Sequence, residues 1–140
     1  MPKIVVQSTS TPYATKITAR NHEWLADEPV DSEGQDRAAT PFEQFLGSIG
    51  SCSVITAQMY ARRKGWPLVS IEMEIDHQRI EAADCPDCET EKGKISEISL
   101  LFRIEGDLTE EQRERLLEIA GRCPVKRTIA GEVKFRVSSR

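Results

Sequence analysis

Residues 40–65 read TPFEQFLGSIGSCSVITAQMYARRKG, and this stretch decides the fold. Thr40 stands before Pro41 and three residues before Glu43, a pattern that predicts the capped start of a helix. Gly65 predicts the end of that helix near residue 64, because glycine readily takes the left-handed conformation that closes a helix. Apolar side chains fall nearly all round this segment, so we expect a buried central helix.

The segments on either side of this helix favour β-strands. Three short strands are expected before it, at residues 3–7, 13–19 and 22–26, where turn residues separate runs of strand-forming residues. After it, apolar and polar residues alternate over residues 69–75 and again over residues 98–104. This alternation predicts two long strands, each with one buried face, that could pair with each other.

The remainder of the chain predicts a second helix and a last strand. Thr109 and Gln112 form another capping box, and the helix that they open is expected to end at Gly121. Residues 132–137, EVKFRV, are expected to close the chain as a strand. Helices and strands are therefore segregated, which is the pattern of an α+β fold, here in a single domain over residues 1–140.

Composition restricts the classes of function. The 140 residues are 39% hydrophobic and 30% charged, with a net charge of −4 at pH 7. No basic face is available to neutralise phosphates, so we expect no nucleic-acid partner. The uncharged stretch between Glu43 and Arg62 is too polar and too short to span lipid, so no membrane association is expected. The N-terminal residues lack the apolar core of a secretory signal, which predicts a cytoplasmic protein.

Two of the four cysteines lie in segments with distinct local chemistry. Cys52 lies inside the predicted central helix, where a buried cysteine usually acts as a small hydrophobic residue. Cys123 precedes Pro124 and is expected to cap another helical turn. A sulfur there meets unpaired N–H groups, with Lys126 and Arg127 close by, and this environment favours the thiolate. It suits redox chemistry, although a Cys-Pro turn can also be structural.

Three segments together resemble the OsmC/Ohr superfamily of thiol-dependent hydroperoxide reductases. They are TPFEQFLGSIGSC at residues 40–52, YARRKGWPLVSIEMEI at residues 60–75 and RCPVKRTI at residues 122–129. The resemblance extends from about Asp27 to the end of the chain, and the paired cysteine motifs are its specific part. It implies the OsmC-like fold, an intertwined homodimer in which antiparallel sheets wrap the buried central helices. The apolar Leu101, on the solvent-facing side of its strand, also favours a partner subunit.

The resemblance also implies a chemical cycle. Cys52 would attack the O–O bond of an organic hydroperoxide and become a sulfenic acid, and Cys123 would condense with it to form a disulfide. An external thiol or dithiol would then reduce that disulfide. No metal and no organic cofactor are implied. The nucleophile must be a thiolate, and a nearby thiol must trap the sulfenic acid before further oxidation.

In the superfamily a cation paired with a glutamate holds the thiolate charge. Glu43 matches the glutamate of the first motif, and Arg37, just before the helix, is the preferred cation, with Arg20 as the second choice. Nine residues of helix turn through about 900°, so Glu43 and Cys52 would face opposite sides of one straight helix. Either Glu43 lies on a non-helical first turn, or it serves the site of a second subunit. The residue after CPV is often histidine in related sequences and is Lys126 here.

Cys85 and Cys88 form a CxxC motif, CPDC, in an acidic connection between the two long strands. It could be a loop without a role, an auxiliary redox pair or half of a zinc site. The acidic neighbours Asp84, Asp87 and Glu89 should raise the thiol pKa values, which argues against an efficient nucleophile. A structural zinc site would need more ligands than this loop supplies. We therefore place the loop without a role first.

The function predicted from the sequence is thus reduction of organic hydroperoxides by Cys52 and Cys123. The alternative is a non-catalytic ligand-binding or stress-associated protein that kept the fold and its cysteines without a competent arginine. Tyr60 and Phe42 on the central helix could line a hydrophobic substrate pocket near Cys52.

Overall fold

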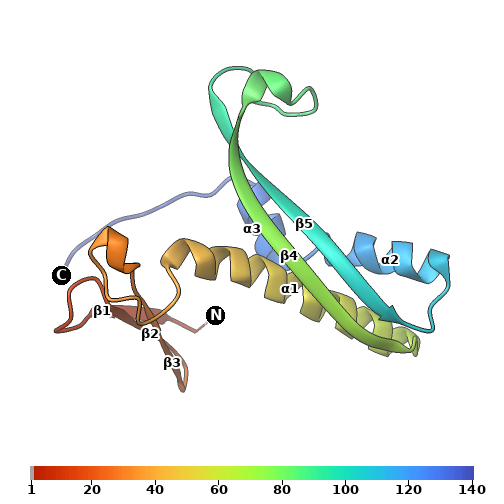
Figure 1. The fold of residues 1–140 in the computed structure, drawn as a ribbon, viewed down its shortest axis with the longest axis horizontal. Helices are drawn as coiled ribbons and strands as arrows, with labels where there is room; N and C mark the ends of the chain where they lie inside the picture. The colour runs from red at the N-terminus through yellow and green to blue at the C-terminus, as the bar shows by residue number, and fades with distance from the viewer. Residues whose placement is uncertain (1) are drawn as a thin grey trace. The chain divides into compact units, whose positions relative to one another are not determined.

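A computed structural model describes residues 2–140 (Figure 1). It has three helices and two antiparallel sheets, and the chain divides into two compact units, one up to Gly47 and one from Ser48 onward. The strands are β1 (Ile4–Ser8), β2 (Thr15–Ala19), β3 (His22–Ala26), β4 (Leu68–Glu81) and β5 (Lys94–Gly106). The helices are α1 (Pro41–Lys64), α2 (Glu110–Ala120) and α3 (Pro124–Ala130), with short 3-10 turns at Val30–Ser32 and Ala82–Asp84. The predicted α+β class is confirmed.

The first unit contains an antiparallel meander in the order β1-β2-β3, in which Ile17 pairs with both Val6 and Trp24. A loop organised by Asp27 follows β3. The carboxylate of Asp27 is buried and accepts hydrogen bonds from the backbone N–H groups of Glu28, at 2.8 Å, and Arg37, at 3.1 Å. These bonds, that of Glu28 foremost, hold the Asp27 pKa below its usual value although burial opposes them.

Helix α1 begins and ends where its sequence predicts. The Thr40 hydroxyl accepts from the N–H of Glu43 at 3.1 Å, and the Glu43 carboxylate accepts from the N–H of Thr40 at 3.2 Å, which completes the capping box. Gly65 follows the last turn with φ of 69°, a left-handed conformation that favours glycine. The helix is therefore defined at both ends by local sequence.

Strands β4 and β5 pair in the second unit over nearly their whole length. Ile71 lies opposite Ile104, Met73 opposite Phe102, and Ile75 opposite Leu100 in the sheet register. These residues are half-buried while the alternating polar residues between them are exposed, which confirms the predicted one-sided pattern. Val69 is the exception: it is 78% exposed, beside a shift of register between Leu68 and Ser70.

A line of small residues on α1 allows the other elements of the second unit to approach it closely. A Cβ added at Gly50 would lie 2.6 Å from the Cδ1 atom at the tip of the Ile75 side chain, so a larger residue there would require that side chain to move. Further along the helix, Ala57 and Ala61 pack with Leu116 and Ala120 of α2 in the buried core. Helix α2 is capped by Thr109 and Gln112 as predicted.

The single chain buries one face of α1, and the strand expected over residues 132–137 is absent from the described residues. The buried positions of α1 are confined to Ile49, Gly50, Ser53, Ala57 and Ala61, whereas Ile55 and Met59 are 50% and 66% exposed. One chain covers only one face of this apolar helix. Residues 132–137 form no strand, because no strand edge pairs with them. Phe135 and Val137 of this segment are exposed.

The core packing of α2 generates a stability prediction. Leu116→Ala should lower the free energy of unfolding by about 2–5 kcal/mol, because Leu116 is fully buried and its removal leaves a cavity. Leu117→Ala is the matched control, since Leu117 is 43% exposed and should cost much less. Urea unfolding followed by circular dichroism measures both, and equal losses would contradict this description of the core.

Candidate active site

The sulfur of Cys52 is held in the middle of α1, on a partly exposed side of the helix. Thr56, one turn later, donates from its hydroxyl to the Cys52 carbonyl at 2.7 Å. The N–H group of Val125, in the first turn of α3, also reaches the Cys52 sulfur as a hydrogen-bond donor. The start of α3 therefore faces this cysteine.

Cys123 is the N-cap of α3, as its place before Pro124 predicts. Its sulfur accepts a hydrogen bond from the N–H of Lys126 at 3.3 Å. The residue is fully buried. Successive N–H groups in the first turn of α3 thus serve the two sulfurs, that of Val125 for Cys52 and that of Lys126 for Cys123. Such N–H groups have no partner within the helix and favour negative charge.

The thiols of Cys52 and Cys123 interact with each other, and their pKa values move in opposite directions. Burial raises the pKa of Cys52, and its hydrogen bond to Cys123 raises it further. For Cys123 burial also raises the pKa, but the nearby Ser53 hydroxyl, the hydrogen bond from the Lys126 N–H and the Cys52 thiol together outweigh it and lower the pKa. Cys123 is therefore the more acidic thiol of the pair.

Ser53 lies beside this pair with its hydroxyl fully buried. The hydroxyl makes no hydrogen bond of good geometry, yet it lies close enough to Cys123 to lower the pKa of that thiol. A buried hydroxyl without a partner is costly unless a charge is present to accept from it. The site thus holds a donor ready for negative charge on sulfur.

Lys126 supplies the positive charge that acts on Cys123. Its ammonium group lowers the pKa of the Cys123 thiol through charge, in addition to the hydrogen bond from its backbone. This effect was expected from the sequence, because Lys126 lies close to the cysteine that caps the helix.

The residues expected to hold the thiolate charge lie in the first unit. Glu43 is helical, since α1 begins at Pro41, so a non-helical first turn does not bring it toward Cys52. The guanidinium of Arg37 donates to the Thr11 hydroxyl at 3.0 Å. Arg20 lies in the turn between β2 and β3 with φ of 57°. The roles of Glu43, Arg37 and Arg20 remain predictions.

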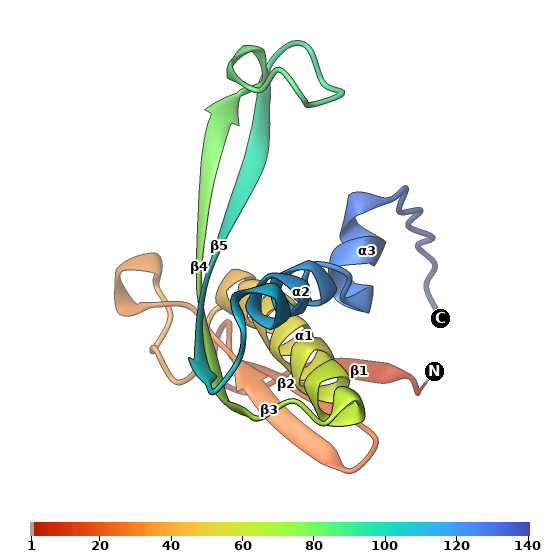
Figure 2. The ribbon, with the colours of Figure 1, turned by 90° about the vertical axis from the view of Figure 1, so that its right-hand side faces the viewer.

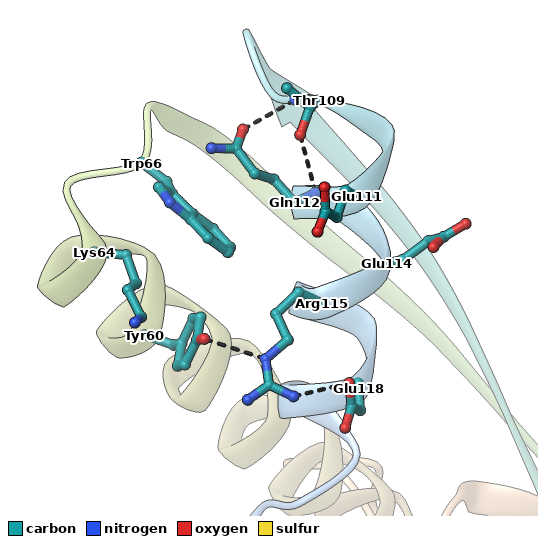
Figure 3. A pocket seen from close by; sticks show the side chains of 9 residues that line it. All are labelled: Tyr60, Lys64, Trp66, Thr109, Glu111, Gln112, Glu114, Arg115 and Glu118. Carbon is teal, nitrogen blue, oxygen red and sulfur yellow. Dashed lines mark hydrogen bonds and ion pairs between the residues drawn. The ribbon is translucent and has the colours of Figure 1, made fainter.

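A second polar centre, which the sequence did not predict, lies between the C-terminal end of α1 and α2 (Figure 3). Tyr60, Lys64 and Trp66 face Gln112 and Arg115 across a cavity of about 610 Å³. Cys52 is not among its lining residues, so Tyr60 does not line a pocket at the cysteine pair as expected. Phe42 instead lines a separate hollow in the first unit.

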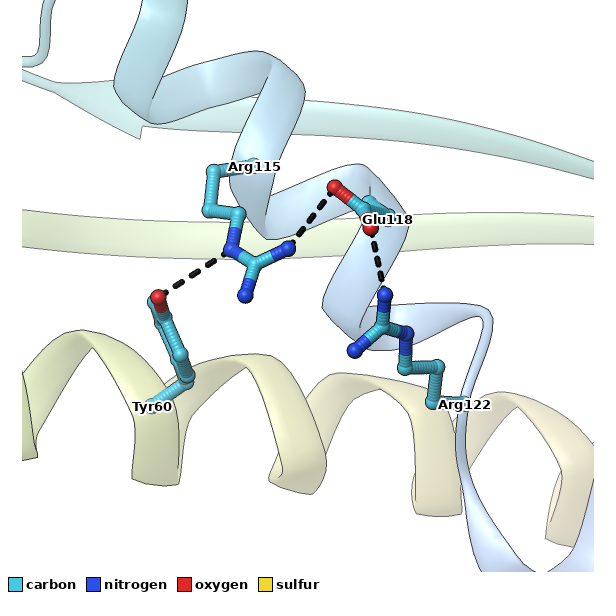
Figure 4. Close-up of polar contacts among 4 residues, drawn as sticks. All are labelled: Tyr60, Arg115, Glu118 and Arg122. Carbon is cyan, nitrogen blue, oxygen red and sulfur yellow. Dashed lines mark hydrogen bonds and ion pairs between the residues drawn. The ribbon is translucent and has the colours of Figure 1, made fainter.

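Cations surround the ring of Tyr60 in this cavity. The Arg115 Nε donates to the Tyr60 hydroxyl at 3.1 Å, and Arg115 also pairs with Glu118 at 2.9 Å (Figure 4). The charges of Arg63, Lys64 and Arg115 lie 5.5–5.7 Å from the ring centre. The hydrogen bond from Arg115, followed by these charges, lowers the pKa of Tyr60 although burial opposes it.

The structural comparisons agree with one another in fold. The chain is similar to an OsmC-like protein from Mycoplasma pneumoniae (17% identity, TM-score 0.72, covering 94% of this chain and 88% of that one). It is also similar to a protein from Psychrobacter arcticus described as an osmotic stress induced and detoxification response protein (19% identity, TM-score 0.70, covering 91% of this chain and 87% of that one). The organic hydroperoxide resistance protein OhrB of Bacillus subtilis gives 18% identity and a TM-score of 0.60, and the match covers 94% of this chain and 91% of that one.

The remaining comparisons concern sequence and hydropathy. No curated protein matches the chain significantly. Within residues 2–140, none of the helices combines the length and the apolar character that crossing a bilayer requires. The family model described as OsmC-like protein matches residues 34–138, which include both Cys52 and Cys123. The chain therefore belongs to the OsmC-like protein family.

Proposed function

We propose that this chain is a thiol-dependent peroxidase that reduces organic hydroperoxides through a two-cysteine cycle in the cytoplasm. The observation that carries the proposal is the contact between the thiols of Cys52 and Cys123, which come from distant parts of the sequence. Family membership and the hydroperoxide resistance proteins among the structural neighbours support the same chemistry.

The two cysteines divide the work by exposure and acidity. Cys52 is partly exposed, so a peroxide in solvent can reach its sulfur, whereas Cys123 is fully buried. The Cys123 thiolate accepts the hydrogen bond of the Cys52 thiol and can take its proton. Cys52 is then the thiolate that attacks the peroxide, and Cys123 holds the proton during the attack.

The cycle balances with this single shared proton. The Cys52 thiolate attacks the peroxide ROOH, the O–O bond breaks, and Cys52 becomes a sulfenic acid while the RO⁻ group takes the proton from Cys123 and leaves as ROH. The Cys123 thiolate then attacks the sulfur of the sulfenic acid, forms the disulfide and releases hydroxide. Two equivalents of an external thiol, or one dithiol, return both cysteines to the thiol state.

The proposed enzyme is a homodimer in which Glu43 and Arg37 act at the cysteine pair of a second subunit. Glu43 is helical and nine residues from Cys52, which places the two on opposite sides of α1. The exposed Ile55 and Met59 give the same helix an apolar face for a partner.

The Tyr60 cavity favours a second candidate, a non-catalytic ligand-binding protein with the OsmC-like fold. The cavity offers an aromatic wall from Tyr60 and Trp66 beside the cations Lys64 and Arg115, apart from the cysteine pair. Steady consumption of cumene hydroperoxide with dithiothreitol, absent in Cys52→Ser, distinguishes the peroxidase from this alternative.

The division of labour predicts different failures for the two cysteine variants. Cys52→Ser should abolish rapid peroxide reduction, because the attacking sulfur is lost. Cys123→Ser should consume about one equivalent of peroxide and then carry a sulfenic acid that excess oxidant drives to the sulfinic or sulfonic acid. Mass spectrometry after peroxide treatment measures both, and should find a Cys52–Cys123 disulfide in the native protein. If Cys52 stays reduced, the proposed cycle is wrong.

The buried Ser53 hydroxyl predicts a change in thiol acidity. Ser53→Ala should raise the pKa of Cys123, because it removes the buried hydroxyl whose proximity lowers that pKa. The ultraviolet absorbance of the thiolate, followed as the pH is raised, should then appear at higher pH in Ser53→Ala than in the native protein. The measurement uses protein with Cys85→Ser and Cys88→Ser, so that only the active pair titrates. Ser51→Ala, at an exposed position of the same helix, should leave the pH profile unchanged.

The exposed apolar face of α1 predicts association of two subunits in dilute buffer. Sedimentation equilibrium at micromolar concentration should give the mass of a dimer, and Met59→Glu should shift the protein toward monomer by placing a charge in the contact. Gln58→Glu is the control, because it adds the same charge at a neighbouring exposed position that is already polar. A native protein that sediments only as monomer would overturn both the dimer and the shared site.

A further inference from the structure

The loop between β4 and β5 carries a cysteine pair that the proposed cycle does not use. The two strands end with Glu81 opposite Lys94, and the N–H of Ala82 donates to the Gly93 carbonyl at 2.7 Å. Beyond these bonds the loop projects from the end of the hairpin, away from α1 and α2 (Figure 2). It is therefore held at its base and open to solvent at its tip.

Within this loop the cysteine sulfurs lie together beside a carboxylate. Cys85 and Cys88 are joined by a disulfide, with their Cα atoms 5.4 Å apart, and the N–H of Cys88 donates to the Cys85 carbonyl at 3.2 Å. A carboxylate oxygen of Asp87 lies 3.3 Å from the Cys85 sulfur. The two sulfurs and this oxygen all lie within 4.8 Å of one another. Four consecutive residues thus bring three metal-ligating groups to one point.

We propose that the dithiol form of this loop binds one thiophilic divalent cation, such as Zn²⁺, through Cys85, Cys88 and Asp87. Binding displaces the two thiol protons, and solvent water completes the coordination shell. Zinc–sulfur bonds of about 2.3 Å in a tetrahedral arrangement separate the two sulfurs by about 3.8 Å. Rotation of the two side chains supplies this separation from the disulfide position, since the backbone already holds the two Cα atoms close together.

The charges around the loop favour a cation over a reactive thiol. Asp84, Glu89 and Glu91 are exposed on the same short connection as Asp87. Their negative charges oppose formation of a free thiolate, which makes the pair a poor nucleophile toward peroxide. A divalent cation reverses this effect, because it neutralises both thiolates and is attracted by the surrounding carboxylates. The acidic sequence is thus unfavourable for a peroxidatic cysteine and favourable for a metal ligand.

Oxidation state controls this binding. When the loop is oxidised, the two thiolates give up two electrons and form the Cys85–Cys88 disulfide, and the cation is released. A hydroperoxide serves as the oxidant by the balance ROOH + 2 RSH → ROH + H₂O + RSSR. The disulfide has no thiolate to bind a metal, so the loop holds the cation only in its reduced state. This site does not depend on turnover by Cys52 and Cys123.

Cobalt is the probe that tests the site. Full-length protein, reduced with a phosphine and kept free of oxygen, is titrated with Co²⁺, and the sulfur-to-cobalt charge-transfer absorption is recorded. One equivalent per chain should bind, Zn²⁺ should displace it, and prior oxidation with diamide should abolish the signal until the phosphine is added again. Absence of the absorption in the reduced native protein would overturn the proposal.

Variants assign the ligands. Cys85→Ser with Cys88→Ser should abolish the absorption, whereas Cys52→Ser with Cys123→Ser should retain it. Asp87→Asn should weaken Co²⁺ binding at least about tenfold, which is the smallest effect usually seen when even an outer partner of a metal ligand is lost. Asp84→Asn, which removes the same charge without removing a ligand, is the matched control and should weaken binding less.

Two results would contradict this assignment. Absorption that survives Cys85→Ser with Cys88→Ser would place the metal at the other cysteine pair. Equal binding of Co²⁺ by the Asp87→Asn and Asp84→Asn variants would show that the Asp87 carboxylate is not a ligand.

Turnover of cumene hydroperoxide by Cys85→Ser with Cys88→Ser should stay close to that of the native protein. This separates failure of the metal site from failure of the peroxidase.

Discussion

The close packing of α1 against its neighbours is the constraint on which the second unit depends. Gly50, Ser53, Ala57 and Ala61 recur at intervals of three or four residues and form one buried line along the helix. The Ile75 side chain of β4 packs against Gly50, and α2 packs against Ala57 and Ala61. Ser53 stands between these contacts and lies against Cys123 at the start of α3. A larger side chain on this line would separate elements that must meet for the two sulfurs to touch.

The cysteine pair shows how backbone and side-chain donors can favour negative charge on a buried sulfur. Backbone N–H groups from the first turn of α3, one buried hydroxyl and the Lys126 ammonium all act on the Cys123 sulfur or its partner. Together they outweigh the effect of burying Cys123 and leave it the more acidic thiol. Cys52 is the less acidic thiol and is partly exposed to solvent. Access to solvent thus belongs to Cys52, and the lower pKa belongs to Cys123.

Local signals in the sequence predicted most of the fold, and non-local contacts explain the rest. The capping boxes at Thr40 and Thr109, the stop at Gly65 and the alternation in β4 and β5 depend on neighbouring residues only, and all are confirmed. A strand also needs a partner edge, which no local pattern can specify, and the prediction for residues 132–137 was therefore wrong. The contact of Cys52 with Cys123 followed from the family resemblance, and the effect of Lys126 followed from its place beside the capping cysteine. The Tyr60 cavity depends on how the helices pack, which no local pattern specifies.

The position of Cys123 as a helix cap has a mechanical consequence. In the reduced protein its sulfur accepts the N–H of Lys126 and so fastens the first turn of α3, a helix of only seven residues. A sulfur committed to a disulfide carries no charge and is a much weaker acceptor, so α3 would lose part of its anchorage whenever the pair is oxidised. The residues after Ala130 have no other regular structure to hold them. The order of the C-terminal residues would then depend on whether the Cys52–Cys123 pair is reduced or oxidised.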